Sequence, residues 1–148
     1  MNVQNSRLLE QEIRELIIPA QKVAHVQVGN SLEHALLVLT KSGYSVIPVL
    51  DLQDRIHGLI STNMIFNSML GLQGLEYEKL DGRKVEDIMN TKVPRLKESD
   101  NFLRALELSI NNPFLCIENQ DNKFVGILTR RSILALVYRQ FRNEKNVQ

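Results

Sequence analysis

The chain has 148 residues, of which 43% are hydrophobic and 24% are charged, and its net charge is +1. These values are typical of a globular protein, and a net charge so near zero argues against binding to nucleic acid or to an anionic membrane. The single cysteine, Cys116, excludes an intrachain disulfide. Because no apolar run approaches roughly 18 residues and the N-terminus has no signal-peptide pattern, we expect a cytoplasmic protein.

The first predicted element is an amphipathic helix over residues 6–17. Leu9, Ile13 and Leu16 recur at helical spacing, and Pro19 ends the helix. Its polar face carries charges of both signs, which favours packing onto the protein's own surface over membrane binding.

Residues 18–70 are predicted to follow the order β-α-β-β-α. Ser31 and Ser61 are typical helix N-cap residues, Gly43 ends the first helix, and a polar turn separates two apolar strands. The predicted elements are a short strand at 22–26, a helix at 32–42, strands at 46–50 and 56–60, and a helix from 61 to about 70.

The same order then repeats in the second half of the chain. The segment 92–96 matches residues 22–26 at an offset of 70 residues. At an offset of 68, the stretches 56–65 and 124–133 each contain an apolar strand with a glycine, then Ser or Thr, then the start of a helix. Such a repeat predicts two similar units, each with an apolar sheet face that the other helps to bury.

The repeat sets the expected domain boundaries. We divide the chain into an N-terminal helix at 1–17, a first repeat at 18–70, a connector at 71–83, a second repeat at 84–142 and a tail at 143–148. The connector is polar and contains glycine, but we expect it to be an ordered link because four side chains can pack against the body, namely Leu72, Leu75, Tyr77 and Leu80.

The repeats resemble a tandem pair of cystathionine-β-synthase (CBS) domains. The resemblance is carried by an Ala- and Leu-rich helix, by the Ser-Val-Ile-Pro-Val strand at 45–49 and by the glycine-containing strand that ends in Ser or Thr, and it covers residues 18–142. It implies an α+β fold in which two β-α-β-β-α repeats pack as a pseudo-two-fold module. Modules of this family commonly form homodimers and bind adenosine-containing ligands in clefts between their repeats.

The short chain with its N-terminal helix is similar to the stand-alone cyclic-di-AMP-binding CBS proteins of Gram-positive bacteria. The resemblance implies a signalling protein with no cofactor, whose ligand is cyclic-di-AMP and whose ligand state controls binding to a target enzyme. The targets that it implies are the (p)ppGpp synthetase/hydrolase and pyruvate carboxylase; the residues themselves identify neither.

Thr129, Arg130 and Arg131 are the predicted phosphate-binding residues. If Thr129 caps a helix, the free N–H groups that follow carry partial positive charge and suit a phosphate. A guanidinium group can bind phosphate oxygens in pairs. Adjacent helical positions point about 100° apart, so we expect only one arginine, Arg131, to face the ligand. The alternative interpretation is that both arginines are ordinary solvated side chains.

Two positions depart from the pattern of the resembled family. There, the Ser or Thr is commonly followed three residues later by an acidic residue that holds both hydroxyls of a free ribose, but Met64 and Ser132 occupy these positions here. A methionine cannot accept those hydrogen bonds in the same way. The departure argues against AMP, ADP, ATP or S-adenosylmethionine, and mildly favours a cyclic dinucleotide, whose riboses have no free 2′,3′-diol. It is also compatible with one or both clefts being empty.

Adenine contacts are expected, by resemblance, at the start of a repeat and on its second strand. The small side chain of Ala24 lets a base approach the backbone, Tyr44 can stack on a base, and Pro48 has no N–H and suits an edge strand beside a cleft. The matching residues are Lys22, Val23, Ala24, His25, Tyr44, Ser45, Val46 and Pro48, with Pro94, Asn112, Pro113 and Phe114 as weaker counterparts in the second repeat.

The sequence has no recognisable catalytic or metal-binding pattern. His25, His34 and His57 are dispersed, and Cys116 lies in an apolar strand, where an inert core cysteine is the simpler interpretation. The missing pattern leads us to expect a protein that is not an enzyme, and the resemblance implies a cyclic-di-AMP sensor. Two alternatives are an adenine mononucleotide sensor for AMP or ATP, and a ligand-independent dimeric adaptor.

Overall fold

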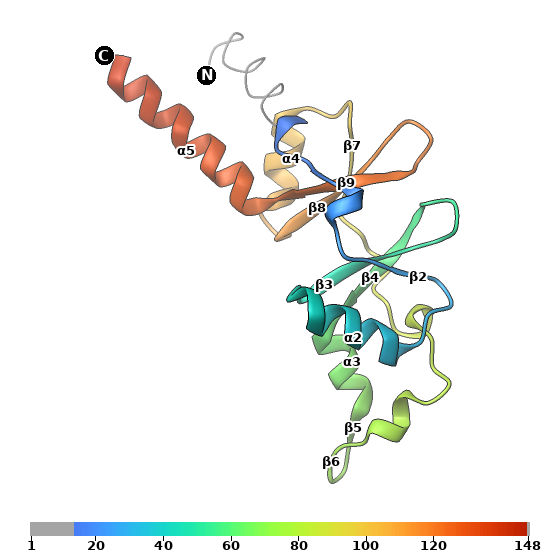
Figure 1. The fold of residues 1–148 in the computed structure, drawn as a ribbon. Helices are drawn as coiled ribbons and strands as arrows, with labels where there is room; N and C mark the ends of the chain where they lie inside the picture. Colours follow the sequence, from blue (N-terminus) through green and yellow to red (C-terminus); the bar gives the residue numbers. More distant parts are fainter. Residues whose placement is uncertain (1–13, 148) are drawn as a thin grey trace. The chain divides into compact units, whose positions relative to one another are not determined.

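The computed structural model describes residues 14–147 and divides the chain into two compact units. The first unit comprises residues 23–93, and the second unit joins the residues before Val23 to those from Pro94 onward. Each unit is a small β-sheet with helices, which confirms the predicted α+β class (Figure 1). The predicted N-terminal helix lies mainly outside the described residues, although residues 14 and 15 are helical.

The first unit has the predicted β-α-β-β-α order. In its three-stranded sheet, β3 lies in the middle, parallel to β2 and antiparallel to β4. The expectation that Pro48 lies in an edge strand was therefore wrong, because β3 has a strand on each side. Its elements in chain order are β2 (Val26–Gln27), α2 (Leu32–Ser42), β3 (Val46–Leu50), β4 (Ile56–Ser61) and α3 (Thr62–Met69).

The helices of the first unit begin and end at the expected residues. The Ser31 hydroxyl accepts the His34 N–H at 3.0 Å, and the Ser61 hydroxyl accepts the Met64 N–H at 3.1 Å. Gly43 ends α2 with a φ of 78°, a left-handed conformation that glycine adopts without steric cost. Local capping chemistry therefore sets these helix ends.

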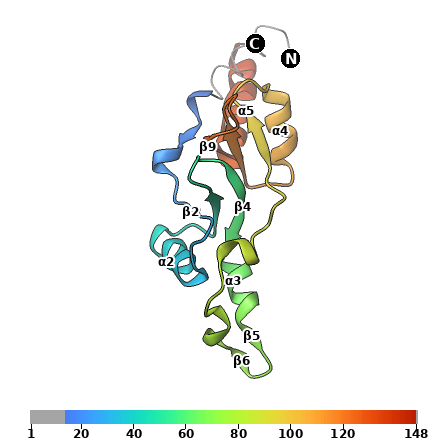
Figure 2. The ribbon, with the colours of Figure 1, turned by 90° about the vertical axis from the view of Figure 1, so that its right-hand side faces the viewer.

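The connector is ordered, but it packs less tightly than expected. It forms the β5–β6 hairpin (Leu70–Gly71 and Gly74–Leu75), followed by the 3-10 helix η2 (Tyr77–Leu80), as Figure 2 shows. Leu80 is buried as predicted, whereas Leu72 and Tyr77 are 104% and 64% exposed and Leu75 is exposed as well. The prediction was wrong for these three side chains: Leu72 and Leu75 belong to the short hairpin, which does not fold back onto the core, and Tyr77 starts η2 on its exposed side.

The second unit repeats the arrangement and adds one strand. Its sheet has the order β1-β9-β8-β7, and the Asn101 side chain caps α4 by accepting the Arg104 N–H at 2.9 Å. Helix α5 continues through the residues assigned to a tail. The elements are β1 (Ile18–Pro19), the 3-10 helix η1 (Ala20–Lys22), β7 (Arg95–Lys97), α4 (Phe102–Ser109), β8 (Phe114–Glu118), β9 (Phe124–Thr129) and α5 (Arg130–Val147).

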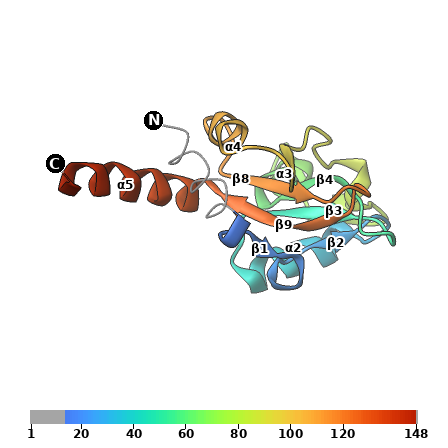
Figure 3. The same ribbon diagram turned by 90° about the horizontal axis from the view of Figure 1, so that it is seen from above.

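The leading segment of each predicted repeat pairs with the last strand of the other repeat. Ile18 is the register partner of Ile127, so β1 lies beside β9 in the second unit (Figure 3). Asn90 pairs with Leu59 in the first unit, and their backbone groups exchange two hydrogen bonds of 2.9 Å. This exchange is the reason that the compact units begin at Val23 and Pro94.

The glycine shared by the two repeated stretches makes this pairing possible. A Cβ atom on Gly126 would lie 2.2 Å from the Ile18 carbonyl oxygen, and one on Gly58 would lie 2.9 Å from the Asn90 carbonyl oxygen. Both distances are too short for non-bonded heavy atoms. The presence of a glycine at the same position of both repeats therefore has a structural cause, the close approach of a neighbouring backbone.

Each unit has its own apolar core. Ile60 in β4 and Leu128 in β9 occupy equivalent positions, and both are 0% exposed. Burial of a side chain of this size contributes about 1.5–3 kcal/mol. Within the described part of the chain, no helix is both long and apolar enough to cross a membrane.

Candidate ligand-binding site

The start of α5 has the geometry predicted for a capped helix. The Thr129 oxygen accepts the Ser132 N–H at 3.1 Å, and its hydroxyl donates to the Ser132 Oγ at 2.9 Å. The first turn of the helix contains no acidic residue. The helix N-terminus therefore keeps its partial positive charge without compensation from its own side chains.

Arg130 and Arg131 have different surroundings. The Arg130 Nε donates to the Ser109 carbonyl at 2.7 Å, which ties this half-buried guanidinium to the C-terminal end of α4. Arg131 is exposed, and within residues 14–147 its side chain has no hydrogen bond or ion pair. The structure thus separates the pair into one engaged and one free cation. The roles of both residues in ligand binding stay predictions.

Lys22 belongs to the same unit as this helix start. It is the exposed last residue of η1, which lies against β9, the strand that ends at Thr129.

The two positions where the resembled family commonly has an acidic residue are occupied by Met64 and Ser132. Met64 is half-buried and packs against the core of the first unit, while the Ser132 hydroxyl is engaged with Thr129. Neither position offers a carboxylate to a ribose.

The remaining predicted residues lie in the first unit, around the start of β2 and of β3. Val23 and Pro48 are buried, Ala24 and Val46 are half-buried, and the others are exposed. The His25 ring contacts the Val23 carbonyl, with 3.2 Å between Nδ1 and the oxygen. The exposed residues are His25, Tyr44 and Ser45.

The start of β3 is held by the start of α3. The Ser45 carbonyl accepts the Thr62 N–H at 3.0 Å, and Val46 is the register partner of Ser61. In the second unit the Pro113 carbonyl accepts the Arg130 N–H at 2.9 Å in the same way. Among the weaker counterparts, Pro94, Asn112 and Phe114 are half-buried and Pro113 is exposed.

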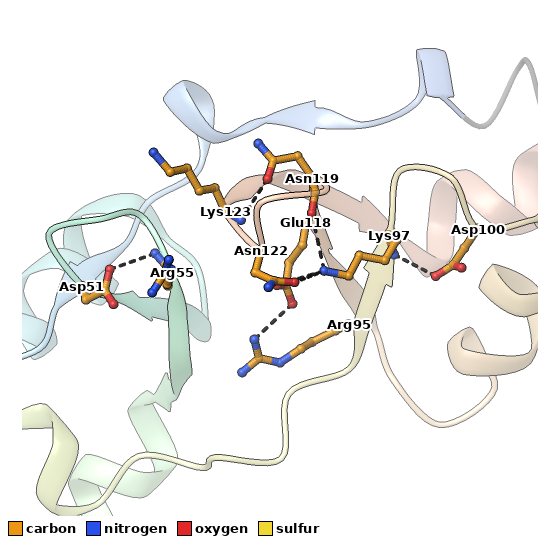
Figure 4. A network of polar contacts seen from close by, with 9 residues as sticks. All are labelled: Asp51, Arg55, Arg95, Lys97, Asp100, Glu118, Asn119, Asn122 and Lys123. Atoms are coloured by element: carbon orange, nitrogen blue, oxygen red, sulfur yellow. Dashed lines mark hydrogen bonds and ion pairs between the residues drawn. The ribbon is translucent and has the colours of Figure 1, made fainter.

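The sequence interpretation missed a buried carboxylate at the end of β8. Glu118 is 3% exposed, and its oxygens lie 3.0 Å from Arg95 Nη1 and 3.8 Å from Lys97 Nζ (Figure 4). Lys97 Nζ also contacts the Asn122 side chain. The available signal was a lone glutamate that ends an otherwise apolar strand, at the position that Leu50 occupies in the first repeat.

The surroundings of two other ionisable groups shift their pKa values. Burial raises the pKa of the Cys116 thiol to about 12, so this group stays protonated near neutral pH. The Arg55 N–H and the His57 side chain hold the pKa of Asp51 below its usual range, as expected for a turn aspartate. Among the described residues, no cluster of three or more His, Cys, Asp or Glu side chains is placed to hold a metal ion.

Comparison with known proteins identifies the family. The CBS domain model matches residues 13–71 and 85–139. The chain is 51% identical over 143 residues to Cyclic di-AMP receptor B of Bacillus subtilis (strain 168), and the match covers 97% of both chains.

Solved structures give the same result. A CBS domain-containing protein of Bacillus anthracis is 55% identical, with a TM-score of 0.81 and coverage of 86% of this chain and 92% of that chain. The CbpB protein of Listeria monocytogenes, solved in complex with c-di-AMP, is 51% identical, with a TM-score of 0.81 and coverage of 88% and 98%. This chain therefore belongs to the CBS domain family.

Proposed function

We propose that this chain is a non-catalytic receptor for cyclic di-AMP, and that its ligand state controls its binding to a target enzyme. The observation that carries the proposal is the start of α5, where Arg131 presents a guanidinium that no residue of 14–147 engages, at the N-terminus of an 18-residue helix. The relative named as a cyclic di-AMP receptor and the relative solved with c-di-AMP support the same ligand.

The charge at this helix start favours a phosphate. Cations at a helix N-terminus are unfavourable by about 0.3–1 kcal/mol each, because they add to the positive end of the helix dipole. A bound phosphate reverses this effect, since it accepts hydrogen bonds from backbone N–H groups and from a guanidinium. We assign the phosphate contacts to Thr129 and Arg131, with Lys22 and Arg130 as nearby positive charge.

The ribose positions favour a cyclic dinucleotide over a mononucleotide. Met64 and Ser132 have no carboxylate to hold a free 2′,3′-diol; Met64 packs against the core, and the Ser132 hydroxyl already accepts a hydrogen bond from Thr129. A cyclic dinucleotide has no such diol, and a carboxylate near its two phosphates would repel them. We assign its adenine contacts to the first-unit residues predicted from the sequence, namely Val23, Ala24, His25, Tyr44, Ser45, Val46 and Pro48.

We further propose that the receptor acts as a homodimer. On α5, the side chains of Leu134, Tyr138 and Phe141 are 56%, 64% and 67% exposed and follow one another at a spacing of four and three residues. This spacing places them on one face of the helix. A second copy of the chain would cover this face, which we call the α5 stripe.

A calorimetric titration tests the proposed ligand. The purified chain is titrated with cyclic di-AMP, cyclic di-GMP, AMP, ATP and S-adenosylmethionine. We expect tight binding of cyclic di-AMP alone. Preferred binding of AMP or ATP would support the mononucleotide sensor instead, and the absence of binding to all five would support a ligand-independent adaptor.

The proposed control of target binding by the ligand needs a separate measurement. The (p)ppGpp synthetase/hydrolase and pyruvate carboxylase are tested for binding to the chain with and without saturating cyclic di-AMP. If the ligand controls target binding, then the affinity for one of these enzymes must change, and that enzyme must change the affinity for the ligand by the same factor. Equal target affinity with and without ligand contradicts this part of the proposal for the enzyme tested.

A further inference from the structure

The first helices of the two units, α2 and α4, end in different ways. Gly43 ends α2 in a left-handed conformation, and its N–H donates to the Leu39 carbonyl at 3.0 Å. The C-cap residue of α4 is Ile110, which keeps a right-handed helical conformation. A helix C-terminus leaves its last carbonyl groups without partners in the helix. The backbone of α2 closes its own end, whereas the last carbonyls of α4 need donors from elsewhere.

Side chains beyond α4 supply these donors. The Asn112 Nδ2 donates to the Leu108 carbonyl at 2.8 Å. The Arg130 Nε donates to the Ser109 carbonyl at 2.7 Å, and its Nη2 lies 3.5 Å from the carbonyl oxygen of Ile110. The first residue of α5 thus holds the last turn of α4.

This contact of Arg130 has no counterpart in the first unit. At the offset of 68 residues, Thr62 occupies the equivalent position. The backbone contact is shared, since the Thr62 N–H donates to the Ser45 carbonyl as the Arg130 N–H donates to the Pro113 carbonyl. Within residues 14–147, however, the Thr62 side chain has no hydrogen bond. The side-chain link from the last helix to the end of the first is therefore specific to the second unit.

The link begins at the proposed phosphate site. Arg130 lies between Thr129, which caps α5, and Arg131, whose guanidinium has no partner within residues 14–147. A ligand that binds only the ordered start of α5 stabilises every contact which that order requires. The contact with α4 is one of these, because both the backbone N–H and the guanidinium of Arg130 hold this residue beside the end of α4.

We infer that Arg130 couples the proposed phosphate site to the C-terminal end of α4, so that a bound ligand stabilises the last turn of that helix. This inference rests on the proposed function and deepens it, because it names an element outside the site whose stability depends on the ligand state. Arg130 acts as a positioning residue in this coupling. Ile110 is 70% exposed, so a change at the end of α4 reaches the protein surface.

Amide hydrogen exchange, followed by mass spectrometry, tests the coupling. Exchange of the N–H groups of residues 106–112 is measured with and without saturating cyclic di-AMP in the wild type, Arg130→Met and Arg130→Lys. The lysine variant keeps a positive charge at this position, but its single nitrogen cannot reproduce both contacts of the guanidinium. It decides the test if Arg130→Met does not fold, which thermal unfolding verifies.

Arg104→Met is the matched control. Arg104 is an exposed arginine of α4, and its Nη1 lies 3.0 Å from Glu107 Oε1 on the same helix. We expect the ligand to slow exchange at the end of α4 by about fivefold in the wild type and in this control, as one hydrogen bond can cause. In both Arg130 variants the ligand should change the exchange rate by less than about twofold.

The ratio of the exchange rates without and with ligand separates coupling from a merely structural role. A structural role of Arg130 would raise both rates alike and leave the ratio unchanged. Ligand-bound Arg130 variants with the wild-type ratio, or a ligand-bound wild type without slowed exchange, would overturn the inference and leave the proposed function intact. Folded Arg130 variants that no longer bind the ligand would also overturn it, because Arg130 would then be a ligand contact itself. A wild type that does not bind cyclic di-AMP would overturn both.

Discussion

At the scale of single residues, the adjacent Arg130 and Arg131 differ in what they contact. Arg130 reaches the end of α4, where its Nε lies 2.7 Å from the Ser109 carbonyl oxygen and its Nη2 lies 3.5 Å from that of Ile110. It therefore satisfies carbonyl groups that a helix C-terminus leaves without partners. Arg131 has no such structural task among the described residues, which makes it the better candidate for ligand binding.

This difference predicts that substitution of the two arginines changes the free energy of unfolding differently. Arg130→Met should lower the free energy of unfolding by about 1–2 kcal/mol, because a charge-assisted hydrogen bond to α4 is lost from a half-buried position. Arg131→Met should leave it unchanged or slightly raised, since one cation leaves the helix N-terminus. Urea unfolding of both variants checks this. Equal losses of stability would show that the two side chains do not differ in this way.

Glu118 is a second residue whose surroundings differ between the repeats. Its buried carboxylate is paired with Arg95 and Lys97. The equivalent position, Leu50, is 3% exposed, and the residues that correspond to the two cations are His25 and Gln27. Only the second unit can therefore hold a charge at this end of its central strand.

Two exchanges between the repeats test this asymmetry. Leu50→Glu should destabilise the chain by about 3–5 kcal/mol, because the buried carboxylate has no cationic partner there. Glu118→Leu should change stability by about 1 kcal/mol or less, since an apolar side chain of similar size replaces the ion pair and both cations can reach water. Chemical unfolding measures both. A tolerated Leu50→Glu would contradict this account of the two strand ends.

At the scale of elements, the leading segment of each repeat lies beside the last strand of the other. Helices α2, α3, α4 and α5 and the two antiparallel strand pairs were predictable, because their caps, turns and apolar spacing depend on neighbouring residues. The short leading strands were expected at 22–26 and at the matching 92–96, but they lie at Val26–Gln27 and Arg95–Lys97. The pairing of Ile18 with Ile127 was not, since it joins residues more than a hundred positions apart and uses a strand of two residues. The glycines were recognised as a repeated motif, but the sequence did not show that each of them contacts the backbone of a neighbouring segment.

Substitution of Gly126 and Gly58 should lower the free energy of unfolding by different amounts. In Gly126→Ala the new methyl group meets the Ile18 backbone carbonyl at 2.2 Å, so β1 must leave the sheet edge. In Gly58→Ala it meets Met89 side-chain atoms at 2.8 Å and the Asn90 carbonyl at 2.9 Å, which smaller shifts can relieve. We expect a loss of about 2–3 kcal/mol for Gly126→Ala and a smaller one for Gly58→Ala. Thermal unfolding that ranks them in the reverse order would contradict this cause.

At the scale of the whole molecule, the candidate site was only partly predictable. The Thr129 cap was predicted from the sequence. Different surroundings for the two adjacent arginines were also expected, because neighbouring helical positions point about 100° apart. The engagement of Arg130 with α4 depends on tertiary contacts, which no local pattern reports. The α5 stripe was also not recognised, because a helix face is apolar in the same way whether it meets a core or a partner.

The proposed homodimer predicts that the α5 stripe controls association. Tyr138→Glu should shift the chain from dimer to monomer, because it places a charge in an apolar interface. Leu72→Glu is the control, since it changes a fully exposed apolar residue of the β5–β6 hairpin and should leave the dimer intact. Sedimentation velocity distinguishes the species. A Tyr138→Glu variant that stays dimeric would exclude this helix face as the interface.

The most direct test of the central claim is a calorimetric titration of the wild type, Arg131→Met and Arg142→Met with cyclic di-AMP. Arg142 is the control because it is an exposed arginine further along the same helix. We predict that the wild type and Arg142→Met bind alike and that Arg131→Met binds about tenfold more weakly or worse, since a charge-assisted phosphate contact is lost. Wild-type affinity in Arg131→Met would contradict the proposed phosphate site, and the absence of binding to the wild type would contradict the proposed ligand.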